Sequence, residues 1–424
     1  MNSFFEKTNY YALLCLAFSL NFPQNFLKFT LAFWFISSLF VLNFKQGKTY
    51  FNKQNIPLLL IGLLLFGRII VSIIHNDTSS LASKLFETQL TLSFLPLILA
   101  FQLNRQFQLI KVLKIYIYGN VVSCVLLIIY FYLFRFHYIS EVGPCLFPND
   151  ITNYSFKDDI YIFQTYCSNY FKHRAGIGAN LSLAIGSIFY LVKKNEWNTR
   201  WKKIAISFAS ILILAVLYAT GSRSGLISLF TILFIGVIYL YSTKNLKLLV
   251  ISFASIVVLL IGLSSLKTTR PIFFNQPGSS NYQKLQNTDP RFKIWESAME
   301  VIDQNIALGV GYSQLKPELF KKYKQNYLTI DLLEKHNTHN QFLQFTLESG
   351  IWAGILFGII LLPIYYNRKY IYLALIFSTT FTIYSLLEDS LIIINGVSIF
   401  VFFITILISS QKIPEINEPE ILFE

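Results

Sequence analysis

Charged residues are scarce in this chain. They make up 13% of its 424 residues, about half of the ~25% found in an ordinary soluble protein. Apolar residues reach 54%, and the mean hydropathy is +0.52. A soluble core cannot cover that much apolar surface, which argues against a soluble enzyme, a disordered protein and a disulfide-rich secreted domain. An integral membrane protein remains.

The chain also has few cysteines, and it shows no internal repeat or low-complexity tract. Its four cysteines form no CxxC pair, so a zinc or redox module is not indicated. The formal net charge is +13. This excess does not predict a nucleic-acid partner, because membrane proteins place Lys and Arg on their cytoplasmic side.

Apolar segments recur along the chain at the length of a spanning helix, which is roughly 20 residues. They lie at 9–22, 26–44, 56–74, 81–101, 109–134, 174–192, 203–220, 223–241, 246–266, 347–366, 370–387 and 390–410. We therefore predict an all-α integral membrane protein with about 12 transmembrane helices, a number that could differ by one or two.

The basic residues gather in alternate connections between these segments. The basic connections hold Lys45, Lys48, Lys53, Arg105, Lys111, Lys114, Lys193, Lys194, Arg200, Lys202, Lys203, Lys244, Lys247, Arg368 and Lys369. The turns near Pro23, Asn76, Gly221 and Asp389 hold few basic residues. The positive-inside rule then places both termini in the cytoplasm. The N-terminus lacks a small-residue cleavage site, so we expect no cleavable signal.

This topology divides the chain into four parts. Residues 1–266 carry nine spans and an outer loop at 135–173, residues 267–346 form a large outer loop, residues 347–410 carry three spans, and residues 411–424 form a cytoplasmic tail. The large loop contains helix signals, so we expect an ordered cap. Cys145 and Cys167 share the first outer loop, where an oxidising compartment favours a disulfide; two free thiols are the alternative.

The first candidate site is the turn Thr220-Gly221-Ser222-Arg223-Ser224-Gly225 on the outer side. Its glycines allow close approach of backbone N–H groups to an oxygen, and the Arg223 guanidinium can bind phosphate bidentately. The alternative is an arginine that reaches the membrane surface from a helix end. Arg174 lies at the outer mouth of the sixth span and adds positive charge there.

The second candidate lies in the large loop, at Asp289-Pro290-Arg291-Phe292-Lys293-Ile294-Trp295. Asp289 suits an N-cap and Pro290 the first helical position. Apolar residues then recur at helical spacing. The pattern predicts an amphipathic helix with Arg291 in its first turn, where the helix dipole favours anions. Gly309 and Gly311 follow this helix. An ordinary cap helix with solvated charges is the alternative.

The third candidate is His336-Asn337-Thr338-His339-Asn340-Gln341. Thr338 and Gln341 have the spacing of a capping box, which predicts that a helix begins here with His339 in its first turn. A neutral histidine can take a proton from a hydroxyl, and nearby helix N–H groups favour the neutral form. Glu348 lies about 13 Å further along a regular helix, so we expect it to be structural. A polar interface histidine is the alternative for His339.

Together these segments resemble the O-antigen ligase and O-antigen polymerase family of bacterial envelope proteins. The turn resembles the family's Ser-Arg motif, and the loop resembles its D-x-R-x-x-x-W…G-x-G pattern. The third segment resembles the H-N-x-x-L-x-x-x-x-E-x-G signature, here from His339 to Gly350. The order and spacing of the motifs agree, and the matched region covers about half of the chain.

The resemblance implies a C-type-like glycosyltransferase in the bacterial inner membrane. Such an enzyme moves a glycan from undecaprenyl diphosphate to a lipid A–core acceptor on the periplasmic face, with inversion and without a metal or other cofactor. His339, Arg223 and Arg291 would be catalytic. The residues expected to bind substrate are Arg174, Ser222, Asn340, His336 and Trp295.

Three other functions stay open at this point. A repeat-unit polymerase of the same superfamily would use nearly the same chemistry on another lipid-linked glycan. A protein O-oligosaccharyltransferase would glycosylate protein hydroxyls. A transporter or flippase without catalysis would place functional charges in the middle of spans, whereas the matched Arg and His residues are expected at the outer face.

Overall fold

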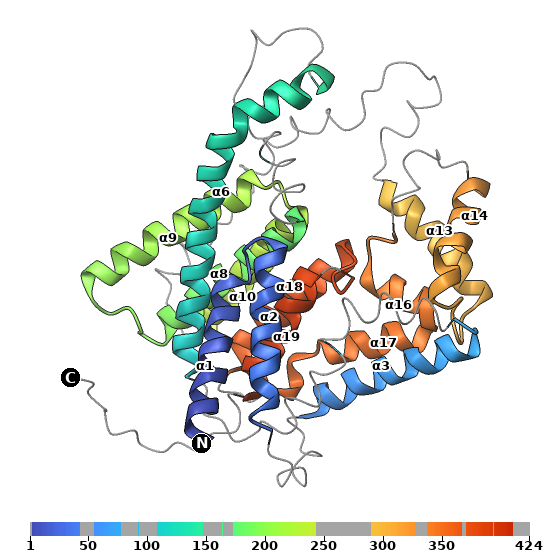
Figure 1. The fold of residues 1–424 in the computed structure, drawn as a ribbon, viewed down its shortest axis with the longest axis horizontal. Coiled ribbons are helices and arrows are strands. Elements are labelled where there is room, and N and C mark those ends of the chain that lie inside the picture. The colour runs from blue at the N-terminus through green and yellow to red at the C-terminus, as the bar shows by residue number, and fades with distance from the viewer. Residues whose placement is uncertain are drawn as a thin grey trace.

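The computed structural model describes residues 2–42, 55–77, 92, 108–146, 163, 173–242, 290–326, 337–366, 370–392 and 394–409. Every regular element within these ranges is a helix, which confirms the all-α class (Figure 1). The α-helices are α1 Asn2–Ser19, α2 Gln24–Leu39, α3 Ile56–Ile74, α6 Leu109–Leu146, α8 Arg174–Lys193, α9 Arg200–Ala219, α10 Arg223–Ser242, α13 Pro290–Gln304, α14 Tyr312–Gln325, α16 Gln341–Ser349, α17 Ile351–Ile360, α18 Ile371–Leu387 and α19 Ile394–Ser409.

The helices follow most of the predicted apolar segments. In the described part of the chain, four are long and apolar enough to cross a membrane: α3, residues 109–133 of α6, α8 and α9. Helices α10, α17, α18 and α19 are apolar but shorter over their described residues. The segment 246–266 and nearly all of 81–101 lie outside the described residues, so the number of twelve spans stays a prediction. The side chains of Cys145 and Cys167 also lie outside them.

The predicted tenth segment, 347–366, was wrong as a single span. The chain breaks at Gly350, whose φ is +99°, so α16 ends at Ser349 and α17 begins at Ile351. An L-amino acid rarely adopts this backbone conformation, and glycine adopts it without steric cost. The break redirects the chain, and α17 then runs beside α3 at the lower right of Figure 1.

Helix α8 is at the centre of the helix bundle, and small residues allow its neighbours to approach closely. A Cβ at Gly178 would lie 2.1 Å from Ser222 Oγ, and one at Gly186 would lie 2.4 Å from a carbon of Ile376. Buried hydrogen bonds add specificity. Ser182 donates to the Gly225 carbonyl at 2.7 Å, and the Asn180 side chain donates to the Leu20 carbonyl at 2.8 Å. Small residues and buried polar bonds are typical of helix contacts in membranes.

Among the connections that the structure describes, the basic one at 193–200 and the turns near Gly221 and Asp389 lie at opposite ends of the bundle. At one end, Lys114 pairs with Glu196 at 2.9 Å, and the Lys193 ammonium lies 3.4 Å from the centroid of the Tyr372 ring. At the other end, the start of α10 meets the start of α8, and the end of α18 meets the loop before α16. For these described connections the arrangement fits the predicted alternation, and the topology of the rest of the chain stays a prediction.

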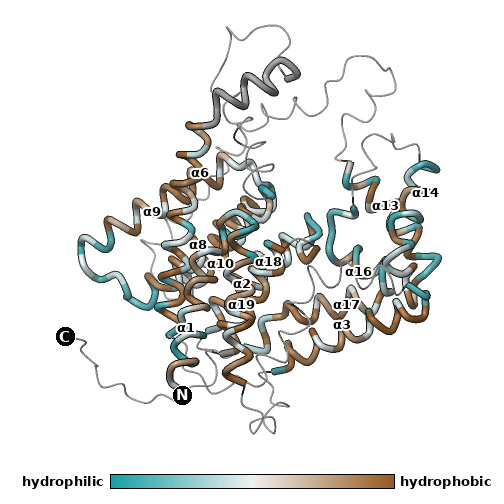
Figure 2. Tube along the Cα trace, viewed as in Figure 1, coloured by the Kyte–Doolittle hydropathy of each residue, from teal (hydrophilic) through white to brown (hydrophobic). Residues whose placement is uncertain are grey.

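Helices α13 and α14 form a second, smaller core beside the bundle. The buried apolar residues of this core are Ile294, Ala298, Val301 and Ile302 of α13, Leu315, Leu319 and Tyr323 of α14, Val310 of their connection, and Leu347 of α16. This part of the chain carries more hydrophilic residues than α3 and α17 (Figure 2). The Asp77 carboxylate, just beyond α3, accepts a hydrogen bond from the Ser313 N–H at the start of α14. A carboxylate at a helix N-terminus is a favourable arrangement, and here it joins the two cores.

Candidate active site

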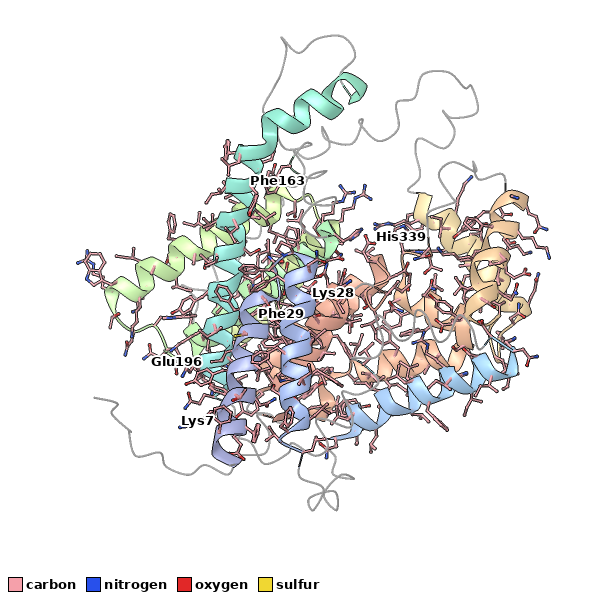
Figure 3. All side chains as sticks on the ribbon, viewed as in Figure 1. Lys7, Lys28, Phe29, Phe163, Glu196 and His339 are labelled. Carbon is pink, nitrogen blue, oxygen red and sulfur yellow. The ribbon has the colours of Figure 1, made fainter. Side chains whose placement is uncertain are left out.

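Glu388 joins two of the residues that the sequence singled out. It caps the C-terminus of α18, and its carboxylate accepts from Arg291 Nη2 at 2.9 Å through Oε1. Its other oxygen, Oε2, lies 3.0 Å from His339 Nδ1. Arg291 and His339 are therefore brought together by a third residue, although 48 positions separate them in sequence. Figure 3 shows His339 between the helix bundle and α13.

Asp389 fixes the backbone that carries His339. Its buried carboxylate accepts from Thr338 Oγ1 at 2.9 Å, from the Asn340 N–H at 3.0 Å and from the His339 N–H at 3.3 Å. His339 has a φ of +50°, a conformation that costs energy for a residue other than glycine. Because the carboxylate binds the backbone on both sides of this strained residue, it holds the imidazole in place beside Glu388.

The predicted capping box was wrong by two residues. Asn340 is the N-cap of α16, and its Oδ1 accepts from the N–H groups of Phe342 and Leu343 at 3.0 and 3.2 Å. Thr338 instead binds Asp389, and the Gln341 side chain accepts from the Leu391 N–H at 2.7 Å. His339 consequently precedes the helix and does not lie in its first turn.

The loop helix α13 is also tied to this segment. It begins at Pro290, as predicted, and places Arg291 beside Glu388; Asp289 lies outside the described residues. Trp295, one turn later, donates from Nε1 to the Thr338 carbonyl at 2.9 Å. The tryptophan of the loop pattern therefore supports the histidine loop, and its indole N–H is already used there.

The electrostatics of the site differ from the expectation of a neutral His339. Burial alone would lower the pKa of His339, but its hydrogen bond to Glu388 and the charges of Glu388 and Asp389 outweigh burial and raise this pKa above 6.5. Burial opposes ionisation of Glu388 as well, yet the bond to His339 and the charges of His173 and Arg291 keep the pKa of Glu388 below its usual value. The pair is an ionic or strongly polarised hydrogen bond.

The other predicted residues that the structure describes lie at the same end of the bundle, in different roles. Arg174 and Arg223 are the first residues of α8 and α10, which pack against each other within one turn of those ends. Ser222 is buried, and its Oγ accepts from the Gly225 N–H at 3.1 Å. Ser222 thus caps α10. His336 lies outside the described residues.

The remaining motif residues hold the loop to the bundle. Glu348 pairs with Arg68 of α3, and the two side chains are 3% and 1% exposed. Gly309 and Gly311 have positive φ, and the N–H groups of Val310 and Gly311 donate to the carbonyls of Leu347 and Glu348 at 2.8 and 3.1 Å. The glycines and Glu348 are structural, which agrees with the expectation for Glu348.

The sequence analysis assigned no role in the site to three of its residues, namely Glu388, Asp389 and His173. His173 directly precedes α8, and its electrostatic neighbours are Glu388, Arg174, His339 and Arg291. The available signal was position: two adjacent acids at the outer end of an apolar helix, and a histidine beside Arg174. Only the fold could show that both positions adjoin His339.

Comparison with known proteins places these residues in a family context. Residues 208–358 match the family model described as O-antigen ligase. The resemblance to the O-antigen ligase family is confirmed. This family implies a glycosyltransferase of the ligase or polymerase type. An uncharacterized protein of Haemophilus influenzae is 28% identical over 203 residues, which cover 45% of this chain and 49% of that protein. The chain spans about half the length of this curated relative.

The O-antigen ligase match includes the three residues expected to be catalytic, Arg223, Arg291 and His339. The match does not include Glu388, at the C-terminal end of α18, or His173, directly before α8. The matched region and its flanking helices therefore assemble the site together.

Proposed function

We propose that the protein is an O-antigen ligase-like glycosyltransferase that moves a glycan from undecaprenyl diphosphate to a lipid A–core acceptor. The observation that carries the proposal is the Glu388 bridge, which gives His339 the arrangement of a general base beside a cationic arginine. The match to the O-antigen ligase family supports the same reaction class.

In this reaction, the His339 imidazole takes the proton of the acceptor hydroxyl through Nε2. Its Nδ1 faces Glu388 at 3.0 Å, so the carboxylate orients the ring and stabilises the imidazolium that forms, as in other carboxylate–histidine pairs. The acceptor oxygen bonds to the anomeric carbon while the bond from that carbon to the diphosphate oxygen breaks. The electron pair leaves with undecaprenyl diphosphate, and the anomeric centre inverts.

The leaving diphosphate needs positive charge, and arginine provides it in this proposal without a metal. Arg291 binds Glu388 through Nη2, and its guanidinium keeps its positive charge in that pair. Arg223 and Arg174 add charge at the neighbouring starts of α10 and α8, where backbone N–H groups also favour anions. Fixed donors of this kind stabilise charge that develops during the reaction.

We assign Ser222, Asn340 and Trp295 to positioning rather than substrate contact. Each already makes a hydrogen bond within the protein, to Gly225, to the first turn of α16 and to Thr338, respectively. The active site would face the periplasm of a bacterial inner membrane. That orientation places the cytoplasmic end at Lys114 and Lys193, in agreement with the positive-inside rule.

A repeat-unit polymerase and a protein O-oligosaccharyltransferase use the same donor chemistry and differ in the acceptor. The test is the glycan that accumulates when the gene is deleted. Long polymer on the lipid carrier supports the ligase, and single repeat units on the carrier would show a polymerase. Normal lipopolysaccharide together with unglycosylated protein would show protein glycosylation. Unaltered lipid-linked glycan in the deletion strain would contradict the proposal.

A further inference from the structure

The connection between α13 and α14 is apolar, whereas the two helices that it joins are charged. Helices α13 and α14 carry five charged residues each, and residues 305–311 between them carry none. The turn 306–308 is exposed along its whole length, with Ile306 51% and Leu308 42% exposed. The sequence assigns this turn to the large outer loop and to none of the predicted spans, so its exposed apolar side chains are unexpected there.

The turn is continuous with the apolar surface of α17. The N–H of Ile351, the first residue of α17, donates to the Ile306 carbonyl at 2.9 Å. Ile351 also begins a stripe of exposed isoleucines that continues through Ile355 and Ile359 at the spacing of one helix face. Single exposed apolar residues are common, but a contiguous apolar surface of this kind marks contact with a partner or a membrane.

Helix α3 extends this surface at the end that the charge pattern assigns to the outer side. It packs along α17, and both helices are hydrophobic over most of their length (Figure 2). Its length and composition suit a membrane span, and its last residues, Ile73 and Ile74, are exposed. The next residue, His75, lies against the connection, since a Cβ on Gly311 would lie 3.0 Å from His75 Cβ. The connection therefore adjoins two apolar helices at the outer end of α3.

The chemistry of the turn suits acyl chains. It offers aliphatic side chains and no charged group, so it matches neither an anionic headgroup nor a glycan. The turn is closed by a hydrogen bond from the Gly309 N–H to the Asn305 carbonyl at 2.9 Å. Non-helical backbone is not tolerated against lipid in the hydrocarbon core, which limits insertion to the boundary of headgroups and acyl chains, a layer about 5–10 Å deep.

We propose that the turn 306–308 inserts the side chains of Ile306 and Leu308 into the outer leaflet of the bilayer. The contact anchors the C-terminal end of α13, the helix whose first turn carries Arg291, to the membrane surface. It goes beyond the transfer reaction proposed above and does not depend on it.

Met299 on α13 provides a matched control position. It is 48% exposed, as much as the residues of the turn, but it shares its helix face with the exposed acids Glu296 and Asp303. That face is suited to water. The turn and Met299 thus have similar exposure and apolar character, and the proposal assigns them opposite surroundings.

The test is photochemical crosslinking to lipid. Benzoylphenylalanine, which reacts with nearby C–H bonds under ultraviolet light, replaces Ile306, Leu308, Met299 or Ile355 in four separate variants. Each full-length variant is reconstituted in nanodiscs of phosphatidylethanolamine and phosphatidylglycerol, irradiated and weighed by intact-protein mass spectrometry. Position 355, in the exposed stripe of α17, is the positive control.

We expect phospholipid adducts from positions 306 and 308 at a yield similar to that from position 355, and none from position 299. Absence of adducts from both 306 and 308 would overturn the proposal. Equal yields from 299 and the turn would also overturn it, because lipid would then cover the cap without preference for the turn. A covalent dimer or an adduct with a polyprenyl lipid, in place of the phospholipid adduct, would assign the turn to another occupant. Absence of adducts from position 355 would remove the lipid-facing surface on which the inference rests.

Discussion

Glu388→Gln is the substitution that tests the carboxylate bridge most sharply. The amide has nearly the shape of the carboxylate, but it has one acceptor oxygen and one NH2 donor, so it cannot accept from both His339 Nδ1 and Arg291 Nη2, now at 3.0 and 2.9 Å, and the negative charge is lost. Asp389 still holds the backbone of residues 338–340. The variant should therefore fold and insert, and its defect should lie in the chemistry.

The expected loss in turnover is on the order of 10²–10⁴-fold, the range that a positioned general base contributes. The pH dependence gives a second readout. A base works in its neutral form, so turnover rises as pH rises through the pKa of His339. Glu388 raises this pKa through its hydrogen bond and charge, so its replacement should move the acidic limb of the profile to lower pH.

The assay is turnover of extracted lipid-linked glycan between about pH 5 and pH 9, with protein amount checked by immunoblot. Glu296→Gln is the matched control, because Glu296 is an exposed acid on α13 outside the site; it should keep wild-type turnover and profile. A Glu388→Gln enzyme that turns over as fast as this control, or whose pH profile keeps the acidic limb of the wild type, would refute the reasoning.

Three further predictions concern charge, backbone and topology. Arg223→Lys should lower turnover at least tenfold at normal expression, because an ammonium cannot reproduce a planar bidentate contact with phosphate; wild-type turnover would contradict the role of Arg223 at the diphosphate. Gly350→Ala should lower the thermal unfolding midpoint in detergent, because a φ of +99° strains alanine by about 1–3 kcal/mol and its Cβ would lie 2.1 Å from the Ala307 carbonyl oxygen. Gly62→Ala, where nothing lies within 4 Å of the added Cβ, is the control and should unfold no earlier than the wild type. A single cysteine at position 195 should resist an impermeant thiol reagent in intact spheroplasts, and its labelling there would contradict the predicted orientation.

Local patterns predicted the helices well and their ends less well. The apolar segment 56–74 is α3 to the residue, because apolar composition and a proline near the N-terminus act locally. The start of α16 was misplaced because Thr338 and Asn340 are both good capping residues, and Asp389, 51 positions after Thr338, decides between them. The break at Gly350 has a similar cause: it depends on contacts with residues 306–308 of the large loop.

Only part of the site was predicted, because some of its residues meet across long distances in the sequence. Arg291 and His339 lie in motifs with recognisable spacing, and the structure brings both to Glu388. Glu388 and His173 carry no local motif, and their roles arise only when α8, α13 and α18 pack around one loop. Residues that act by meeting across long sequence separations leave little trace in the pattern around each of them.

The central claim is that His339 is the base in a transfer from a lipid-linked diphosphate. The most direct measurement is a comparison of wild-type and His339→Ala protein in nanodiscs, with release of undecaprenyl diphosphate from the extracted glycan lipid as the readout. Farnesyl diphosphate binding shows whether the variant is intact. We expect release to fall on the order of 10²–10⁴-fold, with farnesyl diphosphate still bound. Release at the wild-type rate from well-folded His339→Ala protein would contradict the claim.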